Sequence, residues 1–136
     1  MERSTHFVLP LNIAPGDMDA LGHVNNLVYM RWIQEVSAAH WEQLSANHPA
    51  SGVVWVVLRH EIDYKKAALA GDKIRARTYV GATSGSRSQR HVIIEKIDGT
   101  LLAQAITTWC ALDALSLKPR RIDDWLIQLL KPHKKN

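Results

Sequence analysis

The chain has 136 residues, of which 46% are hydrophobic and 22% are charged, and its formal net charge is +4. These fractions lie near the average for globular proteins, which excludes a disordered, collagen-like or low-complexity protein. A chain of this length is typical of one domain. We therefore expect a single domain over residues 1–136, with a core over about 6–115 and a C-terminal helix and basic tail over 116–136.

The periodicity of apolar residues predicts one long helix among several strands. In chain order the expected elements are a strand over 6–13, a helix over 27–44, strands over 53–64, 73–80, 91–97 and 101–112, and a short helix over 122–130. Asn25 or Asn26 is the expected N-cap of the long helix. Residues 81–88 are small and polar, which predicts a turn or a bulged connection.

The links between the later strands are short, and short links require antiparallel pairing. A helix that covers one face of such a sheet gives an α+β fold. The uncovered face and the sheet edges then need another partner, so we expect self-association.

Cysteine content and hydropathy predict a cytoplasmic protein. Cys110 is the only cysteine, so the chain can form no internal disulfide and no paired-cysteine metal site. The N-terminus opens no apolar run of signal-peptide length, and the longest strongly apolar stretch, 53–58, is too short to span a bilayer. The histidines show no zinc-ligand spacing, so we expect no metal. Because the longest apolar stretch is too short to span a bilayer, we also expect no membrane partner.

The basic residues are scattered in small groups outside the C-terminal lysines. No basic stripe carries interleaved aromatic residues, which argues against a nucleic-acid partner. Solvated surface charge is one interpretation of these groups, and contact with a small ligand that carries phosphates is the other.

The segment from Asp19 to Tyr29 holds the residues best suited to catalysis. A carboxylate lies in a glycine-containing loop shortly before the long helix. The free amide N–H groups and positive dipole end of a helix start suit a developing oxyanion. Asp19 beside such a site could act as nucleophile or base on an activated acyl group. In the alternative, Asp19 forms an Asx-turn and Asn25 only caps the helix.

The same segment resembles a motif of the hot-dog-fold thioesterases of the 4-hydroxybenzoyl-CoA thioesterase-like group. In that group D-x-x-G-H-V-N-N-x-x-Y precedes a long helix wrapped by an antiparallel sheet, and residues 61–72 and 86–93 resemble further segments. The resemblance extends over roughly residues 6–115. It implies an α+β hot-dog fold of about five strands around a central helix. It also implies hydrolysis of acyl-CoA without a cofactor, and a homodimer or homotetramer with sites between subunits.

The resemblance also implies roles for individual residues. Asp19 occupies the position of the catalytic carboxylate, and the backbone N–H at Asn26 lies where the thioester carbonyl binds. His23 and Asn25 would shape the surrounding loop, and Tyr29 would pack beside the acyl pocket.

Contacts to the phosphates of CoA transfer less directly. Relatives often carry basic residues at the turn before the third-strand link, where this chain has small polar residues. Ser86, Arg87 and Arg90 are the nearest candidates for binding CoA, followed by Arg59 and Arg120.

Two other functions remain open on the sequence. One is a non-catalytic module that binds acyl-CoA or an acyl-carrier protein, and an assay for free thiol distinguishes it from a hydrolase. The other is a dehydratase or isomerase on the hot-dog scaffold, for which His60 is the candidate base. Trp32, Trp55 and Trp109 are expected around the acyl pocket, which suits an aromatic or an aliphatic acyl group.

Overall fold

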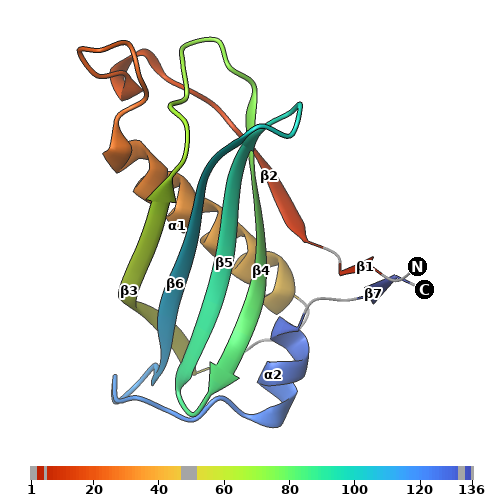
Figure 1. The fold of residues 1–136 in the computed structure, drawn as a ribbon. Coiled ribbons are helices and arrows are strands. Elements are labelled where there is room, and N and C mark those ends of the chain that lie inside the picture. The colour runs from red at the N-terminus through yellow and green to blue at the C-terminus, as the bar shows by residue number, and fades with distance from the viewer. Residues whose placement is uncertain (1–2, 5, 47–51, 132–133, 136) are drawn as a thin grey trace.

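The structure, a computed structural model, describes residues 3–4, 6–46, 52–131 and 134–135. One long helix and a curved antiparallel sheet dominate it (Figure 1). The main elements are β2 (Phe7–Leu11), α1 (Asn26–Ser45), β3 (Val53–Tyr64), β4 (Ile74–Ser84), β5 (Arg87–Lys96), β6 (Leu101–Asp113) and α2 (Asp124–Leu130). A short 3-10 helix, η1 (Pro15–Asp17), precedes α1, and β1 (Arg3–Ser4) pairs with β7 (Lys134–Lys135).

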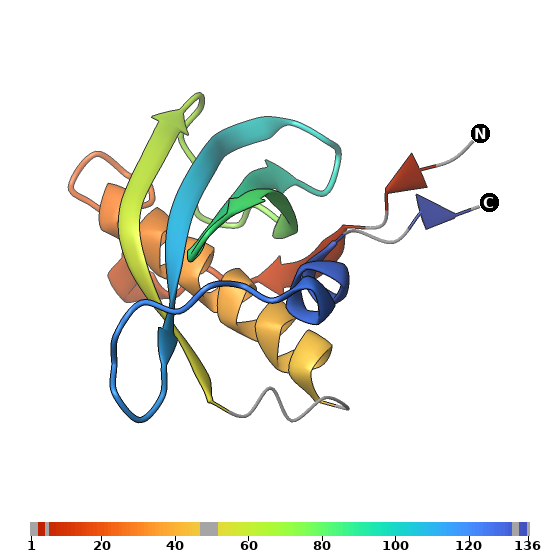
Figure 2. The same ribbon diagram turned by 90° about the horizontal axis from the view of Figure 1, so that it is seen from below.

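The sheet has five strands in the order β2-β4-β5-β6-β3, and every neighbouring pair is antiparallel. It curves around the 20-residue helix α1, so that the helix lies along the concave face (Figure 2). The predicted α+β class, strand order along the chain and central helix are confirmed. Strand β3 forms one edge of the sheet and β2 the other.

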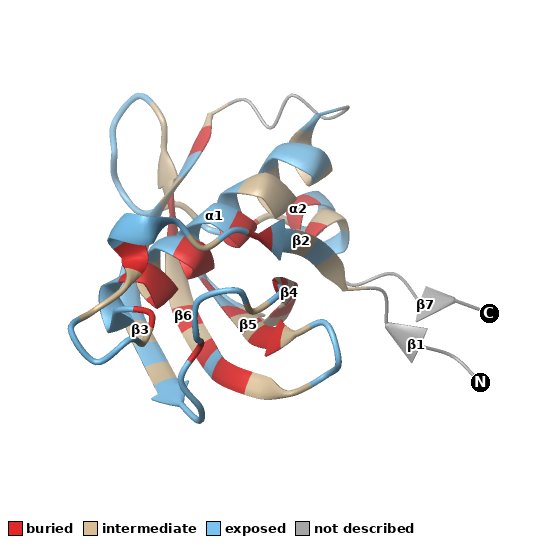
Figure 3. Cartoon of the chain, turned by 90° about the horizontal axis from the view of Figure 1, so that it is seen from above, coloured by how far each residue is buried: buried red, intermediate tan, exposed pale blue. Residues whose placement is uncertain are grey.

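The core lies between α1 and the concave face of the sheet (Figure 3). Helix α1 buries one stripe of side chains, with spacings of three and four residues: Val28, Tyr29, Trp32, Ile33, Val36 and Ser37. Strand β4 contributes alternate residues, as a strand with one covered face must. A second, smaller apolar cluster includes Val53, Val80 and Leu126, and it places α2 against the far end of the sheet.

The hairpin of β4 and β5 is longer than predicted. The two strands continue through most of residues 81–88, and the turn shrinks to Gly85 and Ser86. An irregularity between Val80 and Thr83 is the predicted bulge. Gly81 lies within β4. Glycine suits this position because a Cβ there would lie 2.7 Å from the His91 ring. The small residues therefore serve strand packing here as well as the turn.

Among the described residues, no helix combines the length and the apolarity needed to cross a bilayer.

Candidate active site

A short hairpin holds Asp19 close to the start of α1. Met18 and Val24 pair as an isolated bridge, and the N–H of Asp19 donates to the His23 carbonyl at 2.7 Å. Gly22 turns the hairpin with a φ of +77°, a conformation that favours glycine. The hairpin therefore returns the chain to the level of Asp19 just before α1 begins.

The Asp19 carboxylate is only partly used by this hairpin. Its Oδ1 accepts the N–H of Leu21 at 2.9 Å and the N–H of His23 at 3.0 Å. Its Oδ2 accepts no hydrogen bond from the described residues, and the side chain is half-buried. Asp19 thus makes the Asx-type contacts expected of a structural residue, and one carboxylate oxygen remains available for chemistry.

The first turn of α1 leaves one amide without a partner. Asn25 is the N-cap, and its side chain accepts the N–H of Leu27 at 2.9 Å. The N–H of Val28 donates to the Asn25 carbonyl. The N–H of Asn26 donates to no acceptor in the described part of the chain. Because a helix start also carries a partial positive charge, this amide is suited to bind a carbonyl oxygen.

Tyr29 anchors the first turn of α1 to the segment that follows β3. Its side chain is 2% exposed, and its hydroxyl accepts the N–H of Ala68 at 3.0 Å. The ring also packs edge-on against Tyr64, whose hydroxyl donates to the Asn26 carbonyl at 3.3 Å. Tyr29 therefore holds the first turn of α1, which contains Asn26, against Ala68 and Tyr64.

Asp17, which the sequence analysis did not single out, fixes the base of the same hairpin. Its carboxylate is buried and accepts two hydrogen bonds from the Arg31 guanidinium, each 3.0 Å long. It also accepts the N–H of Ala14, and its own carbonyl accepts the N–H of Asn25. Arg31 stands on the first turns of α1, so this pair ties the hairpin that carries Asp19 to the helix. The only signal in the sequence is a carboxylate and an arginine on either side of a loop.

The Asp17–Arg31 pair predicts a pH-dependent contribution to stability. The Arg31 guanidinium, followed by the Ala14 N–H, lowers the pKa of Asp17 below its ordinary value of 3.8. The unfolded chain therefore takes up this proton first, so the contribution is complete above that value and disappears as the pH falls through the lower folded pKa. Urea unfolding of Asp17→Asn should show a loss of stability at pH 7 that shrinks below about pH 4.

The matched control for that experiment is Glu42→Gln, which removes an exposed carboxylate from the same helix. Its effect should stay within about 0.5 kcal/mol at both pH values. A loss of stability in Asp17→Asn that stays constant from pH 7 to pH 3 would contradict the assigned pair.

The residues predicted to bind CoA do not lie together, nor beside Asp19 of the same chain. Ser86 and Arg87 lie at the turn between β4 and β5, at the opposite end of the sheet from the start of α1 (Figure 1). Arg87 is exposed, whereas Arg90 is 5% exposed and extends into the space beneath α1. Two of the three candidates thus share a surface, and the third lies inside the protein.

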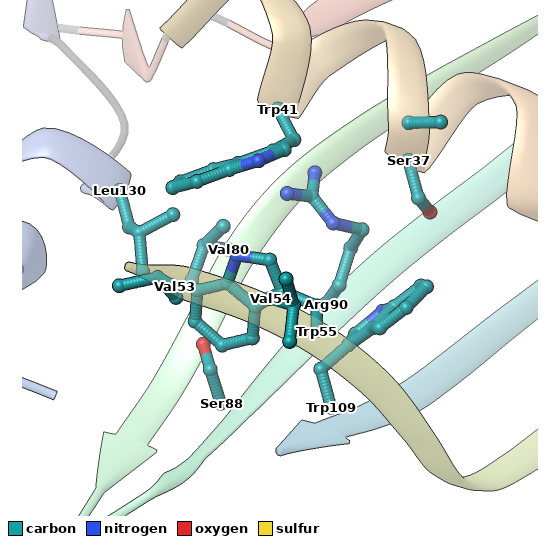
Figure 4. A pocket seen from close by; sticks show the side chains of 11 residues that line it. Ser37, Trp41, Val53, Val54, Trp55, Val80, Ser88, Arg90, Trp109 and Leu130 are labelled. Carbon is teal, nitrogen blue, oxygen red and sulfur yellow. The ribbon is translucent and has the colours of Figure 1, made fainter. Parts of the chain in front are cut away.

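A cavity of about 320 Å³ lies between the second half of α1 and the sheet (Figure 4). Its walls are mostly apolar and aromatic: Trp41, Val54, Trp55, Val80, Trp109 and Leu130. Its polar groups are Ser37, Ser88 and the side chain of Arg90. Of the three tryptophans expected around an acyl pocket, Trp55 and Trp109 line this cavity. Trp32 packs in the main core against Tyr29 instead.

The comparison with known families decides which family this chain belongs to. The model of the thioesterase-like superfamily matches residues 13–130, which include the Asp19 hairpin, α1 and all of β3 to β6. This chain belongs to the thioesterase-like superfamily. No curated protein matches it significantly in sequence.

Solved structures with the same fold include several thioesterases. A thioesterase from Thermus thermophilus, solved with coenzyme A and zinc, is 20% identical, with a TM-score of 0.77 over 90% of each chain. YbaW, a probable thioesterase from Escherichia coli, is 20% identical, with a TM-score of 0.80 over 93% of this chain and 97% of its own. Slr0204, a 1,4-dihydroxy-2-naphthoyl-CoA thioesterase from Synechocystis, is 16% identical, with a TM-score of 0.76 over 93% and 96%. The predicted hot-dog fold of this thioesterase-like chain is thereby confirmed.

Two further features of this superfamily member bear on its chemistry. His60, the candidate base of a dehydratase, pairs through Nδ1 with the Thr107 hydroxyl at 2.9 Å and not with a carboxylate. Burial lowers its pKa. Among the described residues, no three His, Cys, Asp or Glu side chains gather into a metal-binding group.

Proposed function

We propose that this protein is an acyl-CoA thioesterase, with Asp19 as its catalytic carboxylate and the Asn26 amide as its oxyanion donor. The observation that carries the proposal is the juxtaposition at the start of α1. A hairpin holds a carboxylate with one free oxygen just before a helix whose first N–H has no acceptor among the described residues. Membership of the thioesterase-like superfamily supports the same reaction class.

The mechanism needs few groups. The Asn26 N–H stabilises the developing negative charge of the thioester oxygen by donating a hydrogen bond to it. Asp19 then follows one of two routes. It attacks the carbonyl carbon to form a mixed anhydride, which water hydrolyses, or it takes a proton from a water molecule that attacks directly. In both routes the C–S bond breaks and CoA leaves as a thiolate.

The leaving group explains why a second catalytic acid is not required. A thiol has a pKa of about 8.5, so the thiolate leaves near neutral pH without being protonated first. One carboxylate and one helix start are therefore sufficient for the chemistry. His23 and Asn25 hold the backbone around them, and Tyr29 fixes the first turn of the helix.

The complete site is proposed to form in a homodimer or a homotetramer. Strand β3 is an edge of the described sheet, and along it Val54, Val56 and Leu58 are 39%, 39% and 49% exposed. Antiparallel pairing of two β3 edges about a two-fold axis would bring opposite ends of the two chains to the same level. Ser86 and Arg87 of one chain would then approach the Asp19 end of the other, where they could contact CoA phosphates.

The test is the release of free thiol from a panel of acyl-CoAs that differ in chain length and in aromatic character. We expect hydrolysis of at least one member at a rate proportional to protein concentration, with a marked preference among acyl groups. If the protein binds these compounds and releases no thiol from any of them, it is a binding module instead. If it instead adds water across an enoyl-CoA without releasing thiol, the dehydratase alternative holds and His60→Ala should abolish that reaction.

A further inference from the structure

The mechanism above makes no use of Arg90, although its side chain is the most deeply buried cation that the structure describes. Arg90 is 5% exposed, and no carboxylate lies within ion-pair distance of it among the described residues. A buried charge is costly unless a partner of opposite charge accompanies it. The other buried charged residues, Asp17 and Glu95, are each paired with arginine.

The protein groups that contact Arg90 do not neutralise it. One terminal nitrogen donates to His40 Nδ1 at 2.7 Å and to the Thr78 hydroxyl at 3.2 Å. Burial and the Arg90 charge lower the pKa of His40 to about 4, so this imidazole is uncharged at neutral pH. Burial lowers the pKa of Arg90 to about 10, which leaves the guanidinium protonated. The site therefore keeps a net positive charge.

The unneutralised guanidinium lines the cavity beneath α1. In Figure 4 the guanidinium points toward α1 between Trp41 and Ser37, and Trp55 and Trp109 lie on the sheet side of the same cavity. The indole N–H groups of Trp55 and Trp109 are buried and have no acceptor among the described residues. The cavity thus combines one cation with mostly apolar walls. Its volume, about 320 Å³, falls within the range of small-molecule sites.

We propose that this cavity binds a carboxylate on an apolar body, with Arg90 as its counter-ion and the tryptophans as the walls around the apolar part. A carboxylate supplies the negative charge that the site lacks and accepts two hydrogen bonds from a guanidinium. An uncharged ligand would fill the apolar space but leave Arg90 without a counter-ion.

The carboxylate could come from two sources. Ser37 lies about 16 Å along the α1 axis from Asn26, at 1.5 Å of rise per residue, so the cavity is separate from the thioester site of the same chain. One source is a free hydrophobic acid, the product class of the proposed reaction. The other is the carboxylate at the far end of a long dicarboxylic acyl chain. Only the second source rests on the proposed function.

The first arm of the test measures binding by titration calorimetry, with octanoate and octanamide as probes at pH 7. The wild-type protein should bind octanoate at least about tenfold more tightly than octanamide, the effect of one charge-assisted hydrogen bond.

Arg90→Met should remove this preference. Arg121→Met, which removes an exposed arginine, should retain it. Because an apolar residue often replaces a buried charge without loss of stability, we expect Arg90→Met to fold. Arg90→Lys, which keeps the charge but loses the planar fork, should retain part of the preference.

The second arm compares hydrolysis of dodecanedioyl-CoA and dodecanoyl-CoA. If the carboxylate is the end of an acyl chain, Arg90→Met should lower kcat/KM for dodecanedioyl-CoA alone. If it is a free acid, Arg90→Met should weaken octanoate binding and change kcat/KM for the two substrates by the same factor. The proposal is wrong if the wild-type protein shows no preference for the carboxylate in either arm. It is also wrong if that preference survives Arg90→Met in both arms. A failure to hydrolyse any acyl-CoA would overturn the proposed function and leave the binding arm intact.

Discussion

Replacing Asp19 with asparagine should reduce the turnover of acyl-CoA by about 100-fold or more. Asparagine keeps a side-chain oxygen that can accept the N–H groups of Leu21 and His23, so the hairpin should persist. The amide cannot act as a nucleophile or take a proton from water. The Asn26 amide remains in place and can still polarise the thioester, which accounts for residual activity. The measurement is the steady-state release of thiol from the best substrate of the panel.

The control for this prediction is Asp124→Asn, which changes an exposed aspartate on α2. Its turnover should match that of the wild-type protein. Circular dichroism and size-exclusion chromatography should show the same fold and oligomeric state for both variants. If purified Asp19→Asn hydrolyses the substrate at the wild-type rate, Asp19 is structural and its Asx-type contacts are its whole role.

Replacing Trp32 with alanine should lower the free energy of unfolding by about 3–5 kcal/mol. Trp32 is 1% exposed, lies on the buried stripe of α1 and packs edge-on against Tyr29 with 5.3 Å between ring centroids. Its removal leaves a cavity under the turn of α1 that holds Tyr29, and close-packed surroundings cannot collapse fully into it. Urea denaturation followed by circular dichroism measures the loss.

Trp125→Ala is the matched control, since Trp125 on α2 is 45% exposed. We expect its effect on the free energy of unfolding to stay below about 1 kcal/mol. Equal losses in the two variants would mean that Trp32 is not part of a packed core. A small loss in both would contradict the packing of α1 against the sheet.

Features set by neighbouring residues could be predicted from the sequence. The periodicity from Leu27 onward predicted α1 to within about a residue at each end. Asn25 caps it, as one of the two candidate positions. The strands predicted over 53–64 and 101–112 match β3 and β6 to within one residue, and the short link between residues 97 and 101 predicted the antiparallel pairing of β5 with β6. In each case the signal and the structure lie within the same short segment.

Features that depend on contacts between distant segments could not be predicted. Arg90 and Arg87 look alike in the sequence, yet alternation along β5 sends one beneath α1 and leaves the other exposed. The cavity around Arg90 is made by side chains from both helices and the strands β3 to β6, which no local pattern records. The Asp17–Arg31 pair likewise joins a loop to a helix across 14 positions of the chain.

The prediction of Asp19 took both kinds of information. The glycine-containing loop and the following helix indicated a carboxylate near a helix start. The hydrogen bonds to Leu21 and His23 show how that carboxylate is held, with one oxygen left free. The structural and the catalytic interpretations of Asp19 are therefore compatible, since these hydrogen bonds occupy Oδ1 and leave Oδ2 free.

The most direct test of the central claim follows the wild-type protein and its acyl-CoA substrate through many turnovers. Free thiol and free acid should appear in equal amounts and should far exceed the amount of protein present. The rate should be proportional to protein concentration. Saturable binding of acyl-CoA, with less than one equivalent of thiol released per protein chain, would contradict a catalytic role for the hairpin and helix start.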